Sequence, residues 1–431
     1  MATLKAVRGT RDLLPPETEL WNRIEATARQ VFARYNFGEI RTPIFEDTAL
    51  FARSVGEETD IVSKEMYTWE DRARAQSEKT LSLTLRPENT AGVVRAYIEH
   101  GLGESGQLQK LYYIGPQFRR ERPQKGRYRQ FWQIGAEVIG PPSSGSESPL
   151  RDAEVLEMLA TLLDELGITG WALELNSVGS VADRAKYNDV LRAALVDVAP
   201  KMCGDCQRRA VTNPLRVLDC KVPEDQPIIE TLPKVGDSLG EDSKTHFAAV
   251  LAALDAAGVA YKLNQRLVRG LDYYTRTTFE FTHGGLGAQN ALLGGGRYDG
   301  LSEAIGGPKA PGIGFAIGLD RLVLTLQGQE AAAVTEKVDA YIAPIGESLN
   351  AAALVLAREL RKAGLRAELG DGSFRLKKSF EAADKVARRI VILGEDEVRS
   401  GILTVKDFTT GTQTKVPRAE LARVLSEPNG Q

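Results

Sequence analysis

Cysteine and histidine are scarce in this sequence of 431 residues, which contains three of each. An odd number of cysteines does not suit a disulfide framework. Cys203 and Cys206 form a CxxC pair, and Cys220 follows further along the chain. A tetrahedral zinc site would need a fourth ligand, for which Asp205 or Asp219 could serve. Because this pattern is incomplete, the sequence favours reduced structural thiols over zinc, and we predict no metal site.

Long apolar runs and a large excess of charge of one sign are also missing. No run approaches the length of a membrane span, and the N-terminus lacks the apolar core of a signal peptide. We therefore expect a cytoplasmic protein with no membrane partner. The net charge of −3 gives no sign of a nucleic-acid partner, so such a partner has to be argued from local patches. The apolar share of 42% and the charged share of 26% are ordinary for a globular protein.

The order of patterns along the chain indicates a large domain followed by a small one. Residues 1–326 combine amphipathic helices with strand patterns, and within them about 178–260 has little strand pattern, so we predict a helical insertion there. Residues 327–337 have the character of a linker. Strands and helices then alternate over 338–431, which is typical of a small α/β domain. Residues 351–431 carry 15 Lys and Arg against 11 Asp and Glu, a net charge of +4, which suits RNA contact or merely a basic soluble module.

Residues 111–140 predict two β-strands joined by a strongly basic loop. The loop has six Lys or Arg residues over 119–129 against one acid. In the second strand Gln133, Gly135 and Glu137 are two residues apart, so they share one face of the strand. Arginine presents a planar fork of donors that suits phosphate, and the strand face suits a small cationic or NH-bearing ligand. A solvated basic hairpin is the alternative.

Arg119 and Arg269 are two further candidates for ligand binding. Arg119 ends the first strand of the hairpin, and the alternating pattern of 267–273 would place Arg269 on an otherwise apolar strand face if no bulge intervenes. A charged side chain there needs a partner or a ligand, because an unpaired buried charge is very costly. The alternative is an ion pair with Asp272 or Glu280.

A glycine-spaced strand over 312–318 runs into a helix that carries Arg321 in its early turns. Gly312, Gly314 and Gly318 would let a flat or phosphorylated ligand approach the backbone closely. Close packing of the strand against the helix explains these glycines equally well. The pattern matches no Walker or Rossmann fingerprint.

Glu88 and Thr90 stand at a turn just after Pro87. Glu88 could bind an ammonium group, or it could be an early-helix carboxylate that interacts with the helix dipole. From the residues alone the second, structural interpretation is favoured.

Taken together, these segments resemble a class II aminoacyl-tRNA synthetase, and specifically the histidyl-tRNA synthetase family, over nearly the whole chain. The class motifs 2 and 3 have counterparts in FRRERPQKGRYRQFWQIGAEVIG and PGIGFAIGLDRLVL. Two signatures particular to the histidine enzymes have counterparts in LVRGLDYYTRTTFEF and GGGRYDGL. The last domain is similar to the anticodon-binding domain of several class II synthetases, over FRLKKSFEAADKVARRIVILGEDE.

The resemblance implies a fold and a reaction. The fold is an α+β catalytic domain with an antiparallel sheet flanked by helices, a helical insertion between motifs 2 and 3, and a C-terminal α/β anticodon-binding domain. The family works as a homodimer and uses ATP with Mg²⁺. It activates L-histidine as histidyl-adenylate and then transfers it to the 3′ end of tRNA(His).

The resemblance also implies roles for individual residues. Arg119 would hold the α-phosphate of ATP and Arg269 would stabilise it from the other side, which makes these two the catalytic residues. Further ATP contacts are implied for Arg127, Arg321, Gly312, Gly314 and Gly318. The basic loop over 120–129 would meet the acceptor stem of the tRNA.

For histidine the resemblance implies a pocket that recognises three groups. Its residues are Glu88, Thr90 and Gln133 for the α-ammonium group, Glu137 and Tyr274 for the two imidazole nitrogens, Tyr273 for the wall, and Gly135 for the space that the ring needs. Such a pocket rejects substrates without these nitrogens, because its buried polar groups would be left unsatisfied. Three positions depart from the commoner family pattern, at Asn89, Arg120 and Trp132.

Three rival interpretations remain. One is a catalytically inactive paralogue, such as the regulatory subunit of ATP phosphoribosyltransferase, but such proteins lack the C-terminal domain and commonly lose the signature residues. Another is a synthetase for proline, glycine or threonine, which would not contain LDYY or GGGRYDGL. The third is an RNA-binding module without catalysis, and the glycine-rich strand before Arg321 argues against it.

Overall fold

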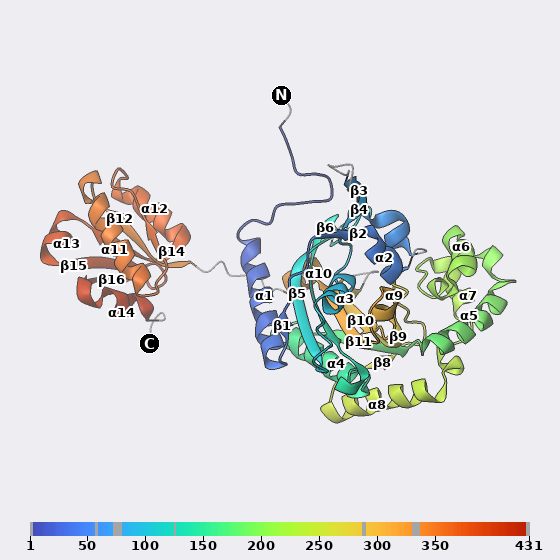
Figure 1. Cartoon of the computed structure of the whole chain (residues 1–431). Helices are drawn as coiled ribbons and strands as arrows, with labels where there is room; N and C mark the ends of the chain where they lie inside the picture. The colour runs from blue at the N-terminus through green and yellow to red at the C-terminus, as the bar shows by residue number, and fades with distance from the viewer. Residues whose placement is uncertain are drawn as a thin grey trace. The chain divides into compact units, whose positions relative to one another are not determined.

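The computed structural model describes residues 3–56, 59–71, 80–124, 126–286, 290–329 and 337–427. The chain divides into two compact units, Met1–Ala333 and Val334–Gln431 (Figure 1). None of the described helices is long and apolar enough to span a lipid bilayer. Most of the predicted linker, 330–336 within 327–337, lies outside the described residues.

An eight-stranded sheet forms the centre of the first unit. Its strands are, in spatial order, β1 (Gly38–Glu39), β5 (Gln109–Phe118), β6 (Gln130–Ile139), β11 (Gly312–Gly318), β10 (Ala291–Arg297), β9 (Thr275–His283), β7 (Trp171–Ser177) and β8 (Lys262–Leu263). The inner strands run antiparallel to one another, whereas the short edge strands β1 and β8 pair in parallel. The predicted antiparallel sheet is confirmed.

Helices cover both faces of this sheet. One face packs against α1 (Glu17–Arg34), α4 (Pro149–Glu165), α8 (Glu241–Ala257) and α10 (Leu319–Gly328), and the other packs against α3 (Thr90–Glu99) and α9 (Leu301–Ala304). Strand β6 contributes Ile134, Ala136 and Val138 to the core under the first group of helices. Because alternate residues of a strand point to opposite faces, Gln133 and Glu137 lie on the face toward α3, which confirms the predicted period.

A buried ion pair ties α4 to β10. Arg297 and Asp152 are fully buried, and Arg297 Nε donates to Asp152 Oδ1 at 3.0 Å. Thr277 on β9 donates to the same carboxylate at 2.6 Å, and Arg297 Nη1 donates to Ser146 O at 2.9 Å. These contacts fix the end of β10 and therefore the position of Tyr298, which follows it.

The segment between β7 and β8 contains helices and no strand within the described range 126–286. Helices α5 (Val181–Leu195), α6 (Gly204–Thr212) and α7 (Gln226–Ile229) share a hydrophobic cluster with residues such as Tyr187 and Leu191. Figure 1 shows these three helices gathered in a lobe beside the sheet. Helix α8 differs, because its Val250 and Leu254 belong to the core of the sheet itself.

The strand predicted over 267–273 is wrong, because these residues form part of an irregular loop between β8 and β9. The carbonyl groups of this loop accept hydrogen bonds from distant side chains. Asn176 Nδ2 donates to Leu267 O at 3.0 Å, and Arg184 Nη1 donates to Tyr274 O at 2.6 Å. These donors satisfy backbone acceptors that a neighbouring strand would otherwise have used. Tertiary contacts therefore override the alternating pattern.

A separate three-stranded sheet lies beside helix α2 (Thr48–Val55) in the first unit. Its order is β2 (Phe45–Asp47), β4 (Leu81–Leu85) and β3 (Tyr67–Asp71). Phe45 and Trp69 are 53% and 40% exposed on it, and their rings stand edge to face with centroids 6.1 Å apart. The sheet therefore presents an exposed aromatic pair.

The second unit has a five-stranded sheet of its own. The strand order is β13 (Ala367–Leu369), β12 (Val338–Pro344), β14 (Ala387–Leu393), β15 (Ile402–Asp407) and β16 (Gln413–Pro417). The helices are α11 (Asn350–Lys362), α12 (Leu376–Val386), α13 (Glu395–Ser400) and α14 (Leu421–Ser426). Strand β12 pairs in parallel with β13 and β14, and β15 and β16 continue the sheet in antiparallel pairing. The predicted α/β domain is confirmed.

We expect Arg297→Met to lower the free energy of unfolding of the first unit by about 3–5 kcal/mol, because it leaves Asp152 as a buried charge without its main partner. Urea unfolding followed by tryptophan fluorescence measures this loss. Arg192→Met is the control, since Arg192 pairs with Asp189 on the surface of α5 and its removal should cost less than about 1 kcal/mol. Equal losses in the two variants would contradict a special role for the buried pair.

Candidate active site

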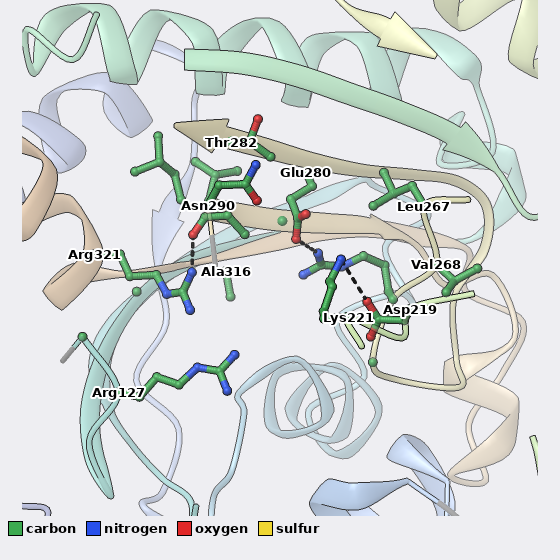
Figure 2. A pocket seen from close by; sticks show the side chains of 18 of the residues that line it. Arg127, Asp219, Lys221, Leu267, Val268, Glu280, Thr282, Asn290, Ala316 and Arg321 are labelled. Atoms are coloured by element: carbon green, nitrogen blue, oxygen red, sulfur yellow. Dashed lines mark hydrogen bonds and ion pairs between the residues drawn. The ribbon is translucent and has the colours of Figure 1, made fainter. Parts of the chain in front are cut away.

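Two adjoining cavities open on the face of the sheet toward α3. Their volumes are about 760 and 140 Å³. Five residues line both cavities, namely Arg119, Gln133, Arg269, Gly294 and Ala316. Figure 2 shows side chains that line the larger cavity, with Arg127 and Arg321 on one side and the strand that carries Glu280 and Thr282 behind. The arrangement suits a large ligand joined to a small one at a common wall.

Arg119 is held at this common wall by its neighbours. It follows the last residue of β5, and its backbone N donates to Arg129 O at 2.9 Å, which continues the pairing of the hairpin. Its Nε donates to Pro87 O at 2.9 Å, and the guanidinium lies over the Phe131 ring, with Cζ 5.2 Å from the ring centroid. The side chain is therefore oriented before any ligand arrives.

Arg269 reaches the same wall from the irregular loop before β9. Its Nη1 forms an ion pair with Glu280 Oε1 at 2.6 Å, which is the second of the two partners considered from the sequence. Its Nε is buried and has no hydrogen-bond partner among the described residues. A Cβ at Gly294 would lie 2.5 Å from the guanidinium, so only glycine fits below it. The structure thus brings Arg119 and Arg269 together and leaves donor capacity on Arg269.

The smaller cavity includes five of the residues predicted for histidine binding, which are Glu88, Thr90, Gln133, Tyr273 and Tyr274. Glu88 accepts hydrogen bonds from the backbone N of Thr90 at 2.8 Å and of Ala91 at 2.9 Å, so it caps α3 as the structural interpretation expected. Burial raises the pKa of Glu88, and these backbone donors oppose the rise. Gln133 Oε1 is buried without a partner among the described residues, and it is therefore an acceptor open to a ligand.

Glu137 lies behind the small cavity and does not line it. It is fully buried, and it accepts hydrogen bonds from Thr90 Oγ1 and Tyr298 OH, both at 2.7 Å. Tyr113 OH lies 3.4 Å from Glu137 Oε1, which is long for a hydrogen bond. Burial raises the pKa of Glu137 to about 8, so the carboxyl group of the free protein is largely protonated at neutral pH.

Two of the predicted glycines make room for protein side chains. A Cβ at Gly135 would lie 2.3 Å from Tyr113 OH, and a Cβ at Gly314 would lie 1.7 Å from Glu137 Oε2. The space expected for a ligand ring above Gly135 therefore holds the hydroxyl end of Tyr113. Tyr113 and Tyr298 line the small cavity and were not identified from the sequence. Tyr298 lies within the GGGRYDGL signature, which was a usable signal for it.

The larger cavity is lined by Arg127, Gly318 and Arg321 from the predicted ATP-binding set. Arg127 Nη1 pairs with Glu121 at 3.2 Å, and Arg321 Nη1 donates to Ala291 O. Burial lowers the pKa of Arg321, and the nearby Arg127 lowers it further. Cations that disfavour each other in this way indicate a site for an anion.

Gly312 lines neither cavity. It faces the Tyr298 ring, which a Cβ at this position would approach to 2.5 Å. Residues from the insertion also line the larger cavity and were not found from the sequence, among them Arg216, Asp219 and Lys221. Figure 2 shows Asp219 and Lys221 beside Val268 of the loop. No sequence pattern marks these residues as cavity-lining, because only the folding of the insertion brings them to the site.

Comparisons with known proteins agree with this geometry. A family model for histidyl-tRNA synthetase matches residues 9–322, and a model for an anticodon-binding domain matches residues 339–428. The chain is 74% identical over 420 residues to a histidine–tRNA ligase of Koribacter versatilis, which covers 97% of this chain and 95% of the relative. It is 56% identical to a histidine–tRNA ligase of Solibacter usitatus, with 98% and 99% of the two chains covered.

A solved structure leads to the same family. The apo histidyl-tRNA synthetase of S. aureus superposes with a TM-score of 0.80 at 37% identity, and 99% of this chain and 100% of that chain are covered. The rival interpretations, as a synthetase for another amino acid or as a simple RNA-binding module, do not account for these matches. From the family model, the relatives and the shared fold it follows that this chain belongs to the histidyl-tRNA synthetase family.

Proposed function

We propose that the small cavity holds L-histidine, the large cavity holds ATP, and the reaction takes place at the wall that they share. The histidine carboxylate attacks the α-phosphorus of ATP, pyrophosphate leaves, and histidyl-adenylate forms. A 3′-terminal ribose hydroxyl of tRNA(His) then attacks the adenylate carbonyl, and AMP leaves. The observation that carries this proposal is that Arg119 and Arg269, from distant parts of the chain, line both cavities.

The two arginines act by electrostatic stabilisation. Negative charge spreads over the phosphoryl oxygens in the transition state, and guanidinium groups fixed in advance stabilise it without reorganisation. The contacts to Pro87 and Phe131 fix Arg119, and the ion pair with Glu280 fixes Arg269. No general base is required, because the attacking carboxylate is already ionised at neutral pH.

Histidine recognition uses polar groups on two sides of the small cavity. Gln133 Oε1 is placed to accept from the α-ammonium group, together with Thr90 and the Glu88 carboxylate. Glu137 and Tyr274 pair the imidazole nitrogens. Glu137 reaches the imidazole after the Tyr113 hydroxyl moves aside. This movement costs little free energy, because the Tyr113 hydroxyl is 3.4 Å from Glu137 Oε1 and forms at most a weak hydrogen bond with it.

ATP is held by Arg127 and Arg321, whose positive charges suit its β- and γ-phosphates. Carboxylate oxygens that suit Mg²⁺ are supplied at the large cavity by Glu65 and Glu121. Burial raises the pKa of Glu65, and the positive charge of Arg119 opposes this rise. The negative charge of Glu121 also raises the pKa of Glu65, so the Glu65 and Glu121 carboxylates are electrostatic neighbours. Mg²⁺ bound with ATP would offset phosphate charge there. Since Gly312 and Gly314 accommodate side chains, the adenosine lies along Ala316 and Gly318 instead.

The proposed partners are the tRNA and a second copy of the chain. The basic loop over 120–129 is proposed to meet the tRNA acceptor stem, and the second unit to bind the anticodon. A homodimer is proposed from the family, and Phe45 and Trp69, exposed on the three-stranded sheet, are apolar side chains that a second copy would cover if the dimer forms there. A cytoplasmic location is expected from the family.

Purified protein should exchange labelled pyrophosphate into ATP only when histidine is present. Histidine should exceed phenylalanine by about 10⁴-fold in this assay, because the aromatic analogue leaves the buried polar groups of the pocket unpaired. Proline and threonine are the controls for the related synthetases. Exchange that is stimulated equally by one of them would remove the assignment.

Arg269→Ala should lower the rate of histidyl-adenylate formation by about 10²–10³-fold, the usual effect of losing one donor to a transition-state oxyanion. Calorimetry should show histidine affinity close to that of the unchanged protein, because Arg269 acts at the phosphate. Arg192→Ala is the control, because Arg192 pairs with Asp189 on the surface of α5 and lines neither cavity, so this variant should keep the rate of the unchanged protein. Loss of histidine binding together with activity would show that the ion pair with Glu280 is merely structural.

A further inference from the structure

We propose that the helical insertion binds one structural Zn²⁺ ion through Cys203, Cys206, Cys220 and Asp225. The three sulfur atoms and a carboxylate oxygen all lie within 4.8 Å of one another. Cys206, Cys220 and Asp225 are buried, and the three cysteines form no disulfide. Four ligands from a closed, buried set are typical of a structural zinc site, whereas a catalytic site keeps an open position.

The local fold brings the four ligands together from two short segments. Cys203 is the N-cap of α6, and Cys206 lies in the first turn of that helix. Cys220 follows a turn after α6, and Asp225 ends the next 3₁₀ turn. The backbone N of Val222 donates to Cys220 Sγ at 3.4 Å. An N–H group directed at sulfur in this way stabilises a thiolate ligand.

The separations suit a metal ion better than a disulfide. Cys203 Sγ and Cys220 Sγ are 3.9 Å apart. Two sulfurs at the corners of a tetrahedron around zinc should be about 3.8 Å apart, given Zn–S bonds of about 2.3 Å. A disulfide would require about 2.05 Å. The cysteine pair therefore has the spacing of ligands in their reduced form.

Asp225 supplies the fourth candidate ligand beside the three thiols. The residue is only 2% exposed, and its carboxylate forms no ion pair with Lys, Arg or His among the described residues. Its oxygens accept from the backbone N of Cys203 at 3.0 Å and from Cys220 Sγ at 3.2 Å. This carboxylate lies within 4.8 Å of all three sulfur atoms, so it supplies the fourth ligand that a tetrahedral site requires.

The two aspartates that the sequence offered as fourth ligands are otherwise engaged. Asp205 is exposed and pairs with Arg208 at 3.0 Å, and Asp219 pairs with Arg216 at 3.3 Å. The expectation of free structural thiols therefore changes once Asp225 is seen. Thiolate and carboxylate ligands in a tetrahedral set favour zinc over magnesium or calcium, which take oxygen ligands in larger number.

The ion would stabilise a wall of the large cavity. Between α5 and α8 the insertion consists of short helices and 3₁₀ turns, and Cys206 and Cys220 lie in its hydrophobic cluster. Asp219 and Lys221, on either side of Cys220, line the large cavity. Asn213 Nδ2 donates to Asp272 in the loop that carries Arg269, at 2.8 Å. The zinc ligands thus cross-link the segment against which the catalytic loop packs.

The test is the metal content of the full-length protein after expression with added zinc. Elemental analysis should find about one zinc per chain, as a single four-ligand site requires. The content should fall to background in Cys206→Ser and in Asp225→Asn, and should be unchanged in the matched control Asp205→Asn. Removal of zinc with a chelator should lower the melting temperature of the unchanged protein by several degrees, and added zinc should restore it.

Cobalt provides a second readout that does not depend on how well the variants fold. Co²⁺ added to the metal-free protein should give the visible absorption of a tetrahedral thiolate site together with thiolate-to-metal charge-transfer bands. The proposal would be overturned by protein that contains no zinc and gives none of these bands. It would also be overturned if mass spectrometry found a disulfide between Cys203 and Cys220 in protein prepared anaerobically without a reducing agent. Equal zinc content in Asp225→Asn and the unchanged protein would overturn the role of Asp225.

Discussion

The fixed position of the Arg269 guanidinium is the constraint on which the site depends. Glu280 holds one end of the group, and Gly294 leaves the space in which it lies. Because Arg269 is on an irregular loop, this position requires the strands β9 and β10 below and the insertion beside it. The insertion contributes Asn213, which binds Asp272 of the same loop. The position of one charged group thus links the sheet, the loop and the insertion.

The rest of the pocket is built as two layers on the same face of the sheet. The inner layer is the Glu137 carboxyl group, which Thr90 and Tyr298 hold by hydrogen bonds. The outer layer consists of the side chains that line the small cavity, among them Tyr113 and Gln133. Burial raises the pKa of Glu137 to about 8, so its state of protonation responds to whatever pairs with it. In the proposed histidine site, this buried acid would therefore pair with a ring whose nitrogens donate and accept protons.

The sequence predicted those features of the site that follow from local patterns. The alternation in β6 correctly separated the face with Gln133 from the core with Ile134, since strand periodicity is a local property. Family resemblance singled out Arg119 and Arg269, which the structure brings to one wall. The irregular loop before β9 was missed because distant side chains such as Asn176 and Arg184 satisfy its backbone. Asp225, the fourth ligand of the proposed zinc site, was missed for a similar reason, because only the folded turn brings it to the cysteines.

The most direct test of the account is a crystal structure of the protein with a non-hydrolysable analogue of histidyl-adenylate. We expect the analogue to occupy both cavities, with the guanidinium groups of Arg119 and Arg269 within hydrogen-bond distance of the phosphate-like group from opposite sides, and the imidazole against Glu137 and Tyr274. A phosphate-like group bound away from Arg269, with that arginine still paired to Glu280 alone, would contradict the central claim.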